Sequence, residues 1–182
     1  MSLARRLPQI LAVSVVAALL ALLVWDLAHS HAGKIAREVD SGKTVPAYNF
    51  SRPRIDATGG QLSLPSLRGK VVVVNFWQSY CEPCHTEART LEAVSNQWKG
   101  KDVVFLGIDE IDLVSAAHAF MKRYGVTYPT VSDDGPLVGH WGVTGYPETF
   151  IVDRTGSVVP PHFYGPVSKV NLNAAIRHAL KT

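Results

Sequence analysis

Cysteine is nearly absent from this sequence of 182 residues, which contains only Cys81 and Cys84. A scaffold held together by disulfides needs more cysteines, dispersed along the chain. A structural zinc site needs about four Cys or His ligands, which one cysteine pair does not supply, so we predict no metal site. The pair is therefore redox-active, an attachment point for haem, or incidental.

Dense positive charge is also missing. The formal net charge is +3, and the basic residues are scattered rather than gathered into a stripe with interleaved aromatic residues. Such a stripe is the usual mark of a surface that binds nucleic acid, so the sequence argues against nucleic acid as a partner. A chain of this length can hold one domain of about 100–150 residues and a tail.

Charge is absent altogether from Ile10 to Trp25, a run that follows Arg5 and Arg6. As a helix this run would span about 24 Å, and flanking apolar residues extend it towards the roughly 30 Å hydrocarbon core of a bilayer. We predict one N-terminal transmembrane helix, a signal anchor over residues 8–28. Basic flanks stay on the cytoplasmic side, so residues 1–7 would lie there and the bulk of the chain outside.

This segment has two other interpretations. A cleaved signal peptide would fit the small residues in Ala28-His29-Ser30 and Ser30-His31-Ala32, and a buried helix of a soluble protein is the third. Residues 29–45 are polar and show little apolar periodicity, so we predict a linker there. The folded domain would then cover residues 46–182.

Strands and helices alternate in the predicted domain. Strands are predicted over 50–55 and 61–64 (a hairpin, with Pro53 at an edge), 71–77, 102–108, 129–131, 148–152 and 157–159. Helices are predicted from the cysteines to Gly100, over 114–124 and 137–141, and from Ser168 onward. Strand–helix–strand units require parallel strands, and the last hairpin adds antiparallel ones. The fold class is therefore α/β, with a mixed central sheet flanked by helices and an N-terminal β-hairpin.

Both cysteines follow the apolar strand Val71–Trp77 in the sequence Cys81-Glu82-Pro83-Cys84. The thiolate is the reactive form in thiol–disulfide exchange, and Cys81 at a helix start would face unpaired N–H groups that favour it. Cys84, one turn in, could then attack the mixed disulfide. Pro83 suits the first helical turn, whereas the charge of Glu82 opposes thiolate formation and favours a reducing or near-neutral couple.

Other residues are candidates for the walls of the same site. Glu87 lies one turn after Cys84, where it could exchange a proton with that cysteine or simply complement the helix dipole. A cis peptide bond before Pro147 would leave the Tyr146 backbone free to pair with an extended segment of a partner. Trp77 is expected to pack beside the dithiol.

These segments resemble a known family. The residues Asn75-Phe76-Trp77, the Cys-Glu-Pro-Cys sequence and Tyr146-Pro147-Glu148-Thr149-Phe150 resemble the thioredoxin fold. More narrowly, they resemble the membrane-anchored extracytoplasmic thioredoxin-like oxidoreductases of bacteria, the TlpA, ResA and CcmG group. The resemblance covers about Val45 to the C-terminus. It implies a thiol–disulfide oxidoreductase on the outer side of the cytoplasmic membrane that needs no cofactor and acts mainly as a reductant.

The resemblance also implies partners and roles for individual residues. The substrate would be a protein dithiol or disulfide, with apocytochrome c as a candidate, and a transmembrane protein would donate electrons. Cys81 would attack, Cys84 would resolve, and Pro147 would be cis and face the dithiol. Glu87 would tune the site, and Glu148 follows the proline as in the cytochrome-maturation members.

The sequence departs from the family at a few positions. Tyr80 stands where tryptophan usually precedes the first cysteine, and Asn75 stands where cytosolic thioredoxins carry a buried aspartate. Pro160-Pro161 interrupts the last strand, which we therefore predict to be short and at an edge. These departures affect the choice of partner more than the chemistry.

The same residues permit other functions. Followed by His85, the cysteine pair also forms the c-type haem attachment signature, with His85 as the proximal ligand. Against this, a buried strand precedes the motif, and Met121 is predicted to lie in the core; an exposed His85 beside the dithiol is the simpler expectation. A peroxiredoxin-like peroxidase and a non-catalytic binding scaffold are the remaining alternatives.

Overall fold

The computed structural model describes residues 3–29, 33–56 and 58–182, in two compact units, Met1–His31 and Ala32–Thr182. The first unit contains one continuous helix, α1 (Leu3–His29). Among the described residues, no helix combines the length and the apolar character needed to cross a membrane. The two possible cleavage sites include residues 30–32, which lie outside the described ranges.

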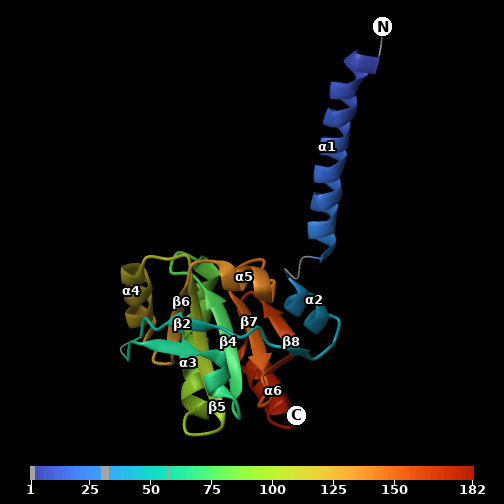
Figure 1. Cartoon of the computed structure of the whole chain (residues 1–182). Helices are drawn as coiled ribbons and strands as arrows, with labels where there is room; N and C mark the ends of the chain where they lie inside the picture. The colour runs from blue at the N-terminus through green and yellow to red at the C-terminus, as the bar shows by residue number, and fades with distance from the viewer. Residues whose placement is uncertain (1–2, 30–32, 57) are drawn as a thin grey trace. The chain divides into compact units, whose positions relative to one another are not determined.

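The second unit is built on a six-stranded sheet in the order β1-β8-β7-β4-β5-β6 (Figure 1). The strands are β1 (Val45–Pro46), β4 (Val71–Trp77), β5 (Val103–Glu110), β6 (Thr130–Asp133), β7 (Glu148–Val152) and β8 (Ser157–Tyr164). Strand β4 pairs in parallel with β5 and antiparallel with β7, and all its residues are buried. The continuous apolar run thus predicted a central strand correctly, because only such a strand is covered on both faces.

Helices cover both faces of this sheet. Helices α3 (Glu82–Trp98) and α6 (Lys169–Ala179) pack on one face, where Leu91 and Ile176 join Val71 and Val73 in one cluster. Helix α4 (Val114–Tyr124) packs beside α3. On the other face, helices α2 (Lys34–Asp40) and α5 (Pro136–Trp141) contribute to the cluster that contains Phe76. The predicted mixed α/β sandwich is confirmed.

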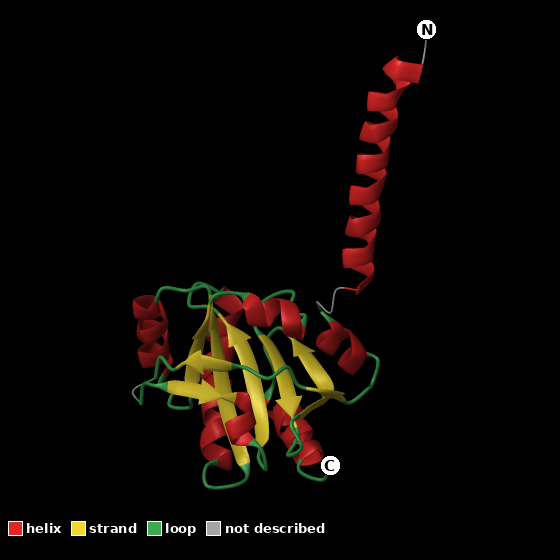
Figure 2. Ribbon diagram, viewed as in Figure 1, coloured by secondary structure: helices red, strands yellow, loops and turns green. Residues whose placement is uncertain are grey.

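The predicted N-terminal hairpin is also confirmed, as a separate two-stranded sheet. Strands β2 (Ser51–Pro53) and β3 (Gln61–Ser63) pair antiparallel, followed by the 3₁₀ helix η1 (Leu64–Leu67). Figure 2 shows this small sheet lying across the larger one. An isolated β-bridge between Arg54, just after β2, and Val131 pairs this part of the chain with β6.

The predicted linker over residues 29–45 needs correction in its second part, because α2 belongs to the folded unit. Ile35, Ala36 and Val39 are buried in the cluster with Trp141. At the start of α2 the chain touches α5 backbone to backbone: a Cβ added to Gly142 would lie 2.6 Å from the Gly33 Cα. The helix was missed because it is short and offers only one turn of apolar periodicity.

The last strand is longer than predicted. Strand β8 continues through Pro160-Pro161, where the peptide bond is cis, and between Val158 and Tyr164 it pairs with β7. An irregularity in the register opposite Phe150 takes up extra residues of β8, so the prolines, which lack an N–H, are not needed in the ladder. The first residues of β8 also pair with β1, so the edge position holds only for the rest of the strand.

Candidate functional site

The two cysteines form a disulfide at the N-terminal end of α3, with their Cα atoms 5.3 Å apart. Cys81 is the N-cap residue of the helix, and its Sγ accepts a hydrogen bond of 3.2 Å from the backbone N–H of Cys84. Glu82 and Pro83 occupy the first helical turn and are exposed. A thiolate at Cys81 would meet the positive end of the helix dipole, as the sequence predicted.

The two sulfur-bearing residues differ in exposure. Cys84 is only 3% exposed, whereas Cys81 is half-buried. An incoming disulfide therefore has access to Cys81 and not to Cys84. This asymmetry fits the order of attack and resolution predicted from the sequence.

An apolar cluster encloses the inner side of the disulfide. Trp77 stacks on Phe120 with ring centroids 4.4 Å apart, and both join Cys84 in one buried cluster, against which Cys81 and Tyr146 also pack. Trp77 thus lies in the wall of the dithiol. The enclosure keeps water from Cys84.

Glu87 is buried beneath this cluster, one turn after Cys84 on α3, with 2% of its surface exposed. Its Oε2 accepts a hydrogen bond of 2.9 Å from the Asn75 side-chain amide, and its Oε1 accepts one of 2.8 Å from the Val167 backbone N–H. Burial raises the pKa of Glu87 to about 7, against the lowering effect of both hydrogen bonds. A carboxyl group with this pKa can take up or release a proton near neutral pH.

Asn75 explains how this acid is held. Its side-chain amide donates to Glu87 on α3 and to the Thr149 hydroxyl on β7, 2.9 Å in both cases. A buried aspartate at this position would place a second carboxyl group beside Glu87. Asparagine supplies donors instead, so the departure from cytosolic thioredoxins suits a buried glutamate.

The second predicted wall is the turn before β7. The Tyr146–Pro147 peptide bond is cis, as the resemblance implied. Glu148 pairs with Phe76 near the end of β4, which places this turn at the same edge of the sheet as the disulfide. Pro147 is buried and Tyr146 is partly exposed. Pairing of the Tyr146 backbone with an extended segment of a partner stays a prediction.

Glu148 itself points into the protein and is 1% exposed. Its Oε1 accepts hydrogen bonds from the Thr144 N–H, the Thr144 hydroxyl and the Gly145 N–H, at 2.9–3.0 Å. Its Oε2 lies 3.0 Å from His162 Nε2. Burial alone would raise the pKa of Glu148, but the hydrogen bonds from His162 and Thr144 lower it below the ordinary value. Glu148 therefore holds the turn as a carboxylate rather than facing substrate.

Two buried acids beside the site were missed by the sequence analysis. Asp109 and Glu110 end β5 and are at most 1% exposed, and within the described part of the chain their carboxyl oxygens have no hydrogen-bond partner. The pKa of each is raised to about 8, first by burial and then by the neighbouring acids Asp112 and Asp133 respectively. Their position at the carboxyl end of a strand parallel to β4 was the available signal, because parallel strands deliver such residues to one edge.

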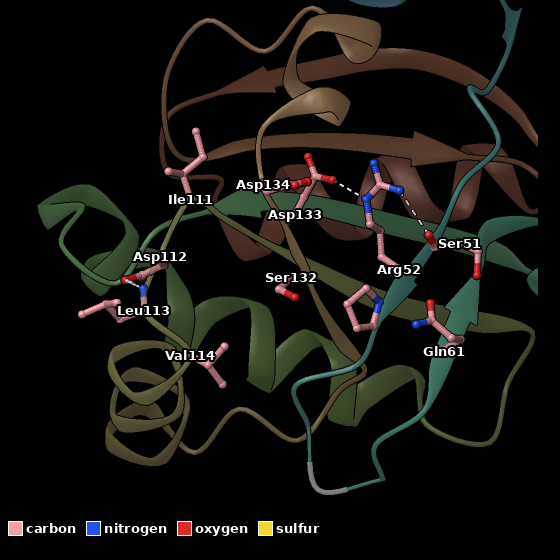
Figure 3. Close-up of a pocket in the computed structure, with 11 residues that line it drawn as sticks. Ser51, Arg52, Gln61, Ile111, Asp112, Leu113, Val114, Ser132, Asp133 and Asp134 are labelled. Atoms are coloured by element: carbon pink, nitrogen blue, oxygen red, sulfur yellow. Dashed lines mark hydrogen bonds and ion pairs between the residues drawn. The ribbon is translucent and has the colours of Figure 1, made fainter.

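A cavity of about 830 Å³ opens next to this edge (Figure 3). Asp112 and Asp133 line it together with the exposed side chains of Ile111 and Leu113. The Arg52 side chain is directed at Asp133, with which it forms an ion pair. Asp112 Oδ2 accepts a 2.7 Å hydrogen bond from the backbone N–H of Ser79 in the loop before the cysteines.

The backbone of this cavity has one unusual residue. Ile111 has a φ of 47°, a left-handed conformation that β-branched residues rarely adopt, and its N–H donates to the Asp133 carbonyl at 2.9 Å. Its side chain is 64% exposed. The cavity is therefore lined by acidic side chains and has an apolar rim, and it adjoins the loop that carries the cysteines.

His85 is not the exposed residue that the sequence predicted. Its Nδ1 lies 2.7 Å from the Tyr124 hydroxyl, and its ring meets Phe120 edge to face. Met121 packs in the core, as predicted. The histidine is thus engaged by α4 rather than presented to a ligand. Within the described ranges, no three His, Cys, Asp or Glu side chains group closely enough to hold a metal ion.

Comparison with known sequences gives consistent matches. The pattern of the AhpC/TSA family matches residues 42–160. The chain is 34% identical over 134 residues to the thiol-disulfide oxidoreductase ResA of Bacillus subtilis (strain 168), covering 70% of this chain and 69% of the relative. It is 32% identical over 119 residues to ResA of Bacillus thuringiensis (strain Al Hakam), covering 65% of this chain and 66%, just under two thirds, of that relative.

Solved structures show the same fold. A thiol:disulfide interchange protein of the thioredoxin family from Chlorobium tepidum TLS matches with a TM-score of 0.67 and 29% identity, over 76% of this chain and 97% of that one. The dsbF structure from MTB, in mixed oxidized and reduced forms, matches with a TM-score of 0.65 and 30% identity, over 71% and 94%. These matches agree with the thioredoxin-like architecture expected from the sequence.

Proposed function

The chain belongs to the AhpC/TSA family, and from this premise we propose that it is a thiol–disulfide oxidoreductase acting on protein dithiols and disulfides. The observation that carries the proposal is the disulfide at the start of α3, with Cys81 accessible and Cys84 buried. The names of the ResA relatives and of the interchange protein from Chlorobium tepidum TLS support it.

In the reducing direction, the chemistry runs in two exchanges. The Cys81 thiolate attacks one sulfur of the substrate disulfide, forms a mixed disulfide and displaces a substrate thiolate. The Cys84 thiol loses its proton, with Glu87 as the acceptor, and its thiolate attacks the Cys81 sulfur. The second substrate thiolate then leaves and the Cys81–Cys84 disulfide forms. Two electrons pass to the substrate, and a donor dithiol must return two to the protein.

The substrate would bind along the turn that faces the cysteines. The backbone of Tyr146 is the proposed site for pairing with an extended substrate segment, with Pro147 and Trp77 as walls on either side. Glu82 and Pro83 lie on the exposed surface that such a segment would meet. Cys81 would then face the substrate, and Cys84 would stay enclosed by the protein.

We further propose the physiological setting. The protein acts mainly as a reductant in cytochrome c biogenesis, with apocytochrome c as substrate and a transmembrane protein as electron donor. The charge of Glu82 near Cys81 supports the direction, because a nearby carboxylate disfavours the thiolate and so stabilises the disulfide form relative to the dithiol. The resemblance to the TlpA, ResA and CcmG group supports the partners.

The proposed location follows from the N-terminal segment. The uncharged run Ile10–Trp25 after Arg5 and Arg6 supports a single-pass signal anchor in the bacterial cytoplasmic membrane. The oxidoreductase domain would then lie on the extracytoplasmic side, where exported cytochromes receive haem. A cleaved signal peptide would give the same side without the anchor.

Replacement of the resolving cysteine tests the function directly. In Cys84→Ala the second exchange cannot occur, so the mixed disulfide through Cys81 should accumulate in cells, and mass spectrometry of the adducts would identify substrate and donor. The Cys81→Ala variant is the matched control and should trap nothing. Equal recovery from both variants, or peroxide turnover faster than disulfide turnover in the wild type, would contradict the proposal and favour a peroxidase.

A further inference from the structure

His162 on β8 lies between two carboxylates, and its side chain has no exposed surface. Its Nε2 is 3.0 Å from Glu148 Oε2 on β7, and its Nδ1 is 3.3 Å from Asp40 Oδ1 on α2. The ring stacks on Phe150 with centroids 3.9 Å apart and an angle of 16° between the planes. Three elements of the fold therefore meet at this imidazole.

Each ring nitrogen of His162 faces a carboxylate oxygen, Nε2 that of Glu148 and Nδ1 that of Asp40. An N–H at either position donates to the carboxylate that it faces. The imidazole therefore links Glu148 on β7 to Asp40 on α2.

The consequence of this arrangement lies at the substrate-binding turn. The carboxylate of Glu148 uses one oxygen for His162 and the other for three donors in Thr144 and Gly145, the two residues before Tyr146. With His162 in place, Glu148 can rotate only by breaking hydrogen bonds on both sides. His162 is thus connected to the turn through Glu148.

The far end of the network is fixed by α2. Asp40 is the last residue of that helix, and its Oδ2 also accepts a hydrogen bond from the Tyr164 hydroxyl. Ile35 and Val39 anchor α2 in the core. The aspartate is therefore held in place by its helix and by β8. It can restrain the imidazole at Nδ1, the nitrogen that does not face Glu148.

We propose that His162, restrained by Asp40, is a positioning residue that fixes Glu148 and thereby the Tyr146–Pro147 turn for binding of the substrate polypeptide. This inference rests on the proposed function. A protein substrate would need the turn in its bound geometry, because strand addition uses the backbone of Tyr146. A small aromatic disulfide can react at Cys81 without it.

The test compares two substrates in the full chain. Insulin serves as the protein disulfide and 5,5′-dithiobis(2-nitrobenzoate) as the small one. His162→Phe keeps a ring to stack on Phe150 but loses both hydrogen bonds. We expect its KM for insulin to rise about tenfold, equivalent to about 1.4 kcal/mol, with kcat and the rate with the small disulfide within about twofold of wild type.

Conservative variants guard against a mere loss of folding. His162→Gln places an amide N–H where Nε2 stood, so it should restore most of the insulin KM, and Asp40→Asn should raise that KM about threefold, or about 0.65 kcal/mol. His178→Phe, at an exposed histidine of α6, is the matched control and should leave the KM unchanged.

An unchanged insulin KM in His162→Phe, or rates with both substrates that fall together, would overturn the positioning role. Should His162→Phe fail to fold, His162→Gln and Asp40→Asn decide the matter by the same two criteria. Failure of the wild type to reduce either disulfide would instead refute the proposed function, so the two failures are distinguishable.

Discussion

Among the individual residues, Glu87 combines a buried environment that disfavours the carboxylate with a position close to the cysteines. It is almost fully buried, it lies one turn from Cys84, and burial raises its pKa to about 7. The unfolded chain would give the same group its ordinary value of 4.5. The acid therefore changes charge in the pH range in which thiols exchange.

Replacement by glutamine should expose that role. In Glu87→Gln no carboxylate accepts the Cys84 proton, so resolution of the mixed disulfide should slow about tenfold at pH 7. The pH dependence of this step should lose the limb near pH 7 that the Glu87 carboxyl group contributes. Single-turnover kinetics between pH 5 and 9 would measure both. A rate and profile identical to wild type would assign Glu87 a structural role only.

The same shift fixes the sign of a stability effect. A carboxyl group whose pKa is higher in the folded state binds its proton more tightly there, so its contribution is fully present below pH 4.5 and is lost as the pH rises through about 7. The shift corresponds to about 3 kcal/mol. Denaturant unfolding of Glu87→Gln should lack this part of the pH dependence, which provides an independent check on the kinetics.

Among the elements, α2 is the one whose importance the sequence concealed. Its buried face, Ile35, Ala36 and Val39, packs in the core, and its last residue belongs to the network that reaches the Tyr146–Pro147 turn. Packing and positioning are thus combined in seven residues. The element is part of the working domain rather than a spacer.

Core substitution in α2 should therefore affect the whole unit. Ile35→Ala should lower the free energy of unfolding by about 2–4 kcal/mol, the usual range for an isoleucine removed from a core. Urea unfolding followed by tryptophan fluorescence would measure it, since Trp141 packs in the same cluster. Lys34→Ala, at an exposed position of the same helix, should change stability by less than about 0.5 kcal/mol. A similarly small effect of both variants would mean that α2 does not stabilise the domain.

At the scale of the whole molecule, the chain divides into an N-terminal helical unit and an oxidoreductase unit. The proposed anchor would hold the first unit in the membrane and place the second unit on the extracytoplasmic side. Membrane insertion depends on the apolar character of Ile10–Trp25, because an arginine near the centre of a membrane helix raises the free energy of insertion by about 2.5–3.5 kcal/mol.

Charges placed in that run should change the location of the protein. In bacteria that express the full chain, wild type should stay with the membrane after a carbonate wash, and protease added to spheroplasts should digest its domain. Leu19→Arg combined with Leu20→Arg should leave the protein protected inside the cell. Leu19→Val is the control and should behave as wild type. A shortened soluble product would instead indicate a cleaved signal peptide.

The sequence by itself determined the parts that depend on local order and strong periodicity. The valine run predicted β4, the spacing of the cysteines predicted a dithiol at a helix start, and the segment around Pro147 indicated the facing turn. These signals are local, or they are family motifs that keep their spacing. Helix α2 and the full length of β8 were missed, because a single apolar turn and a pair of prolines carry the opposite local signal.

Only the tertiary structure decided which polar groups act together. Glu148 was expected to line the site, but it faces inward because β8 brings His162 to its other oxygen. Asp109 and Glu110 became notable only when the sheet buried them beside Asp112 and Asp133. The physical reason is that burial and hydrogen-bond partners depend on contacts between residues far apart in the chain, for which a single sequence carries no periodic signal.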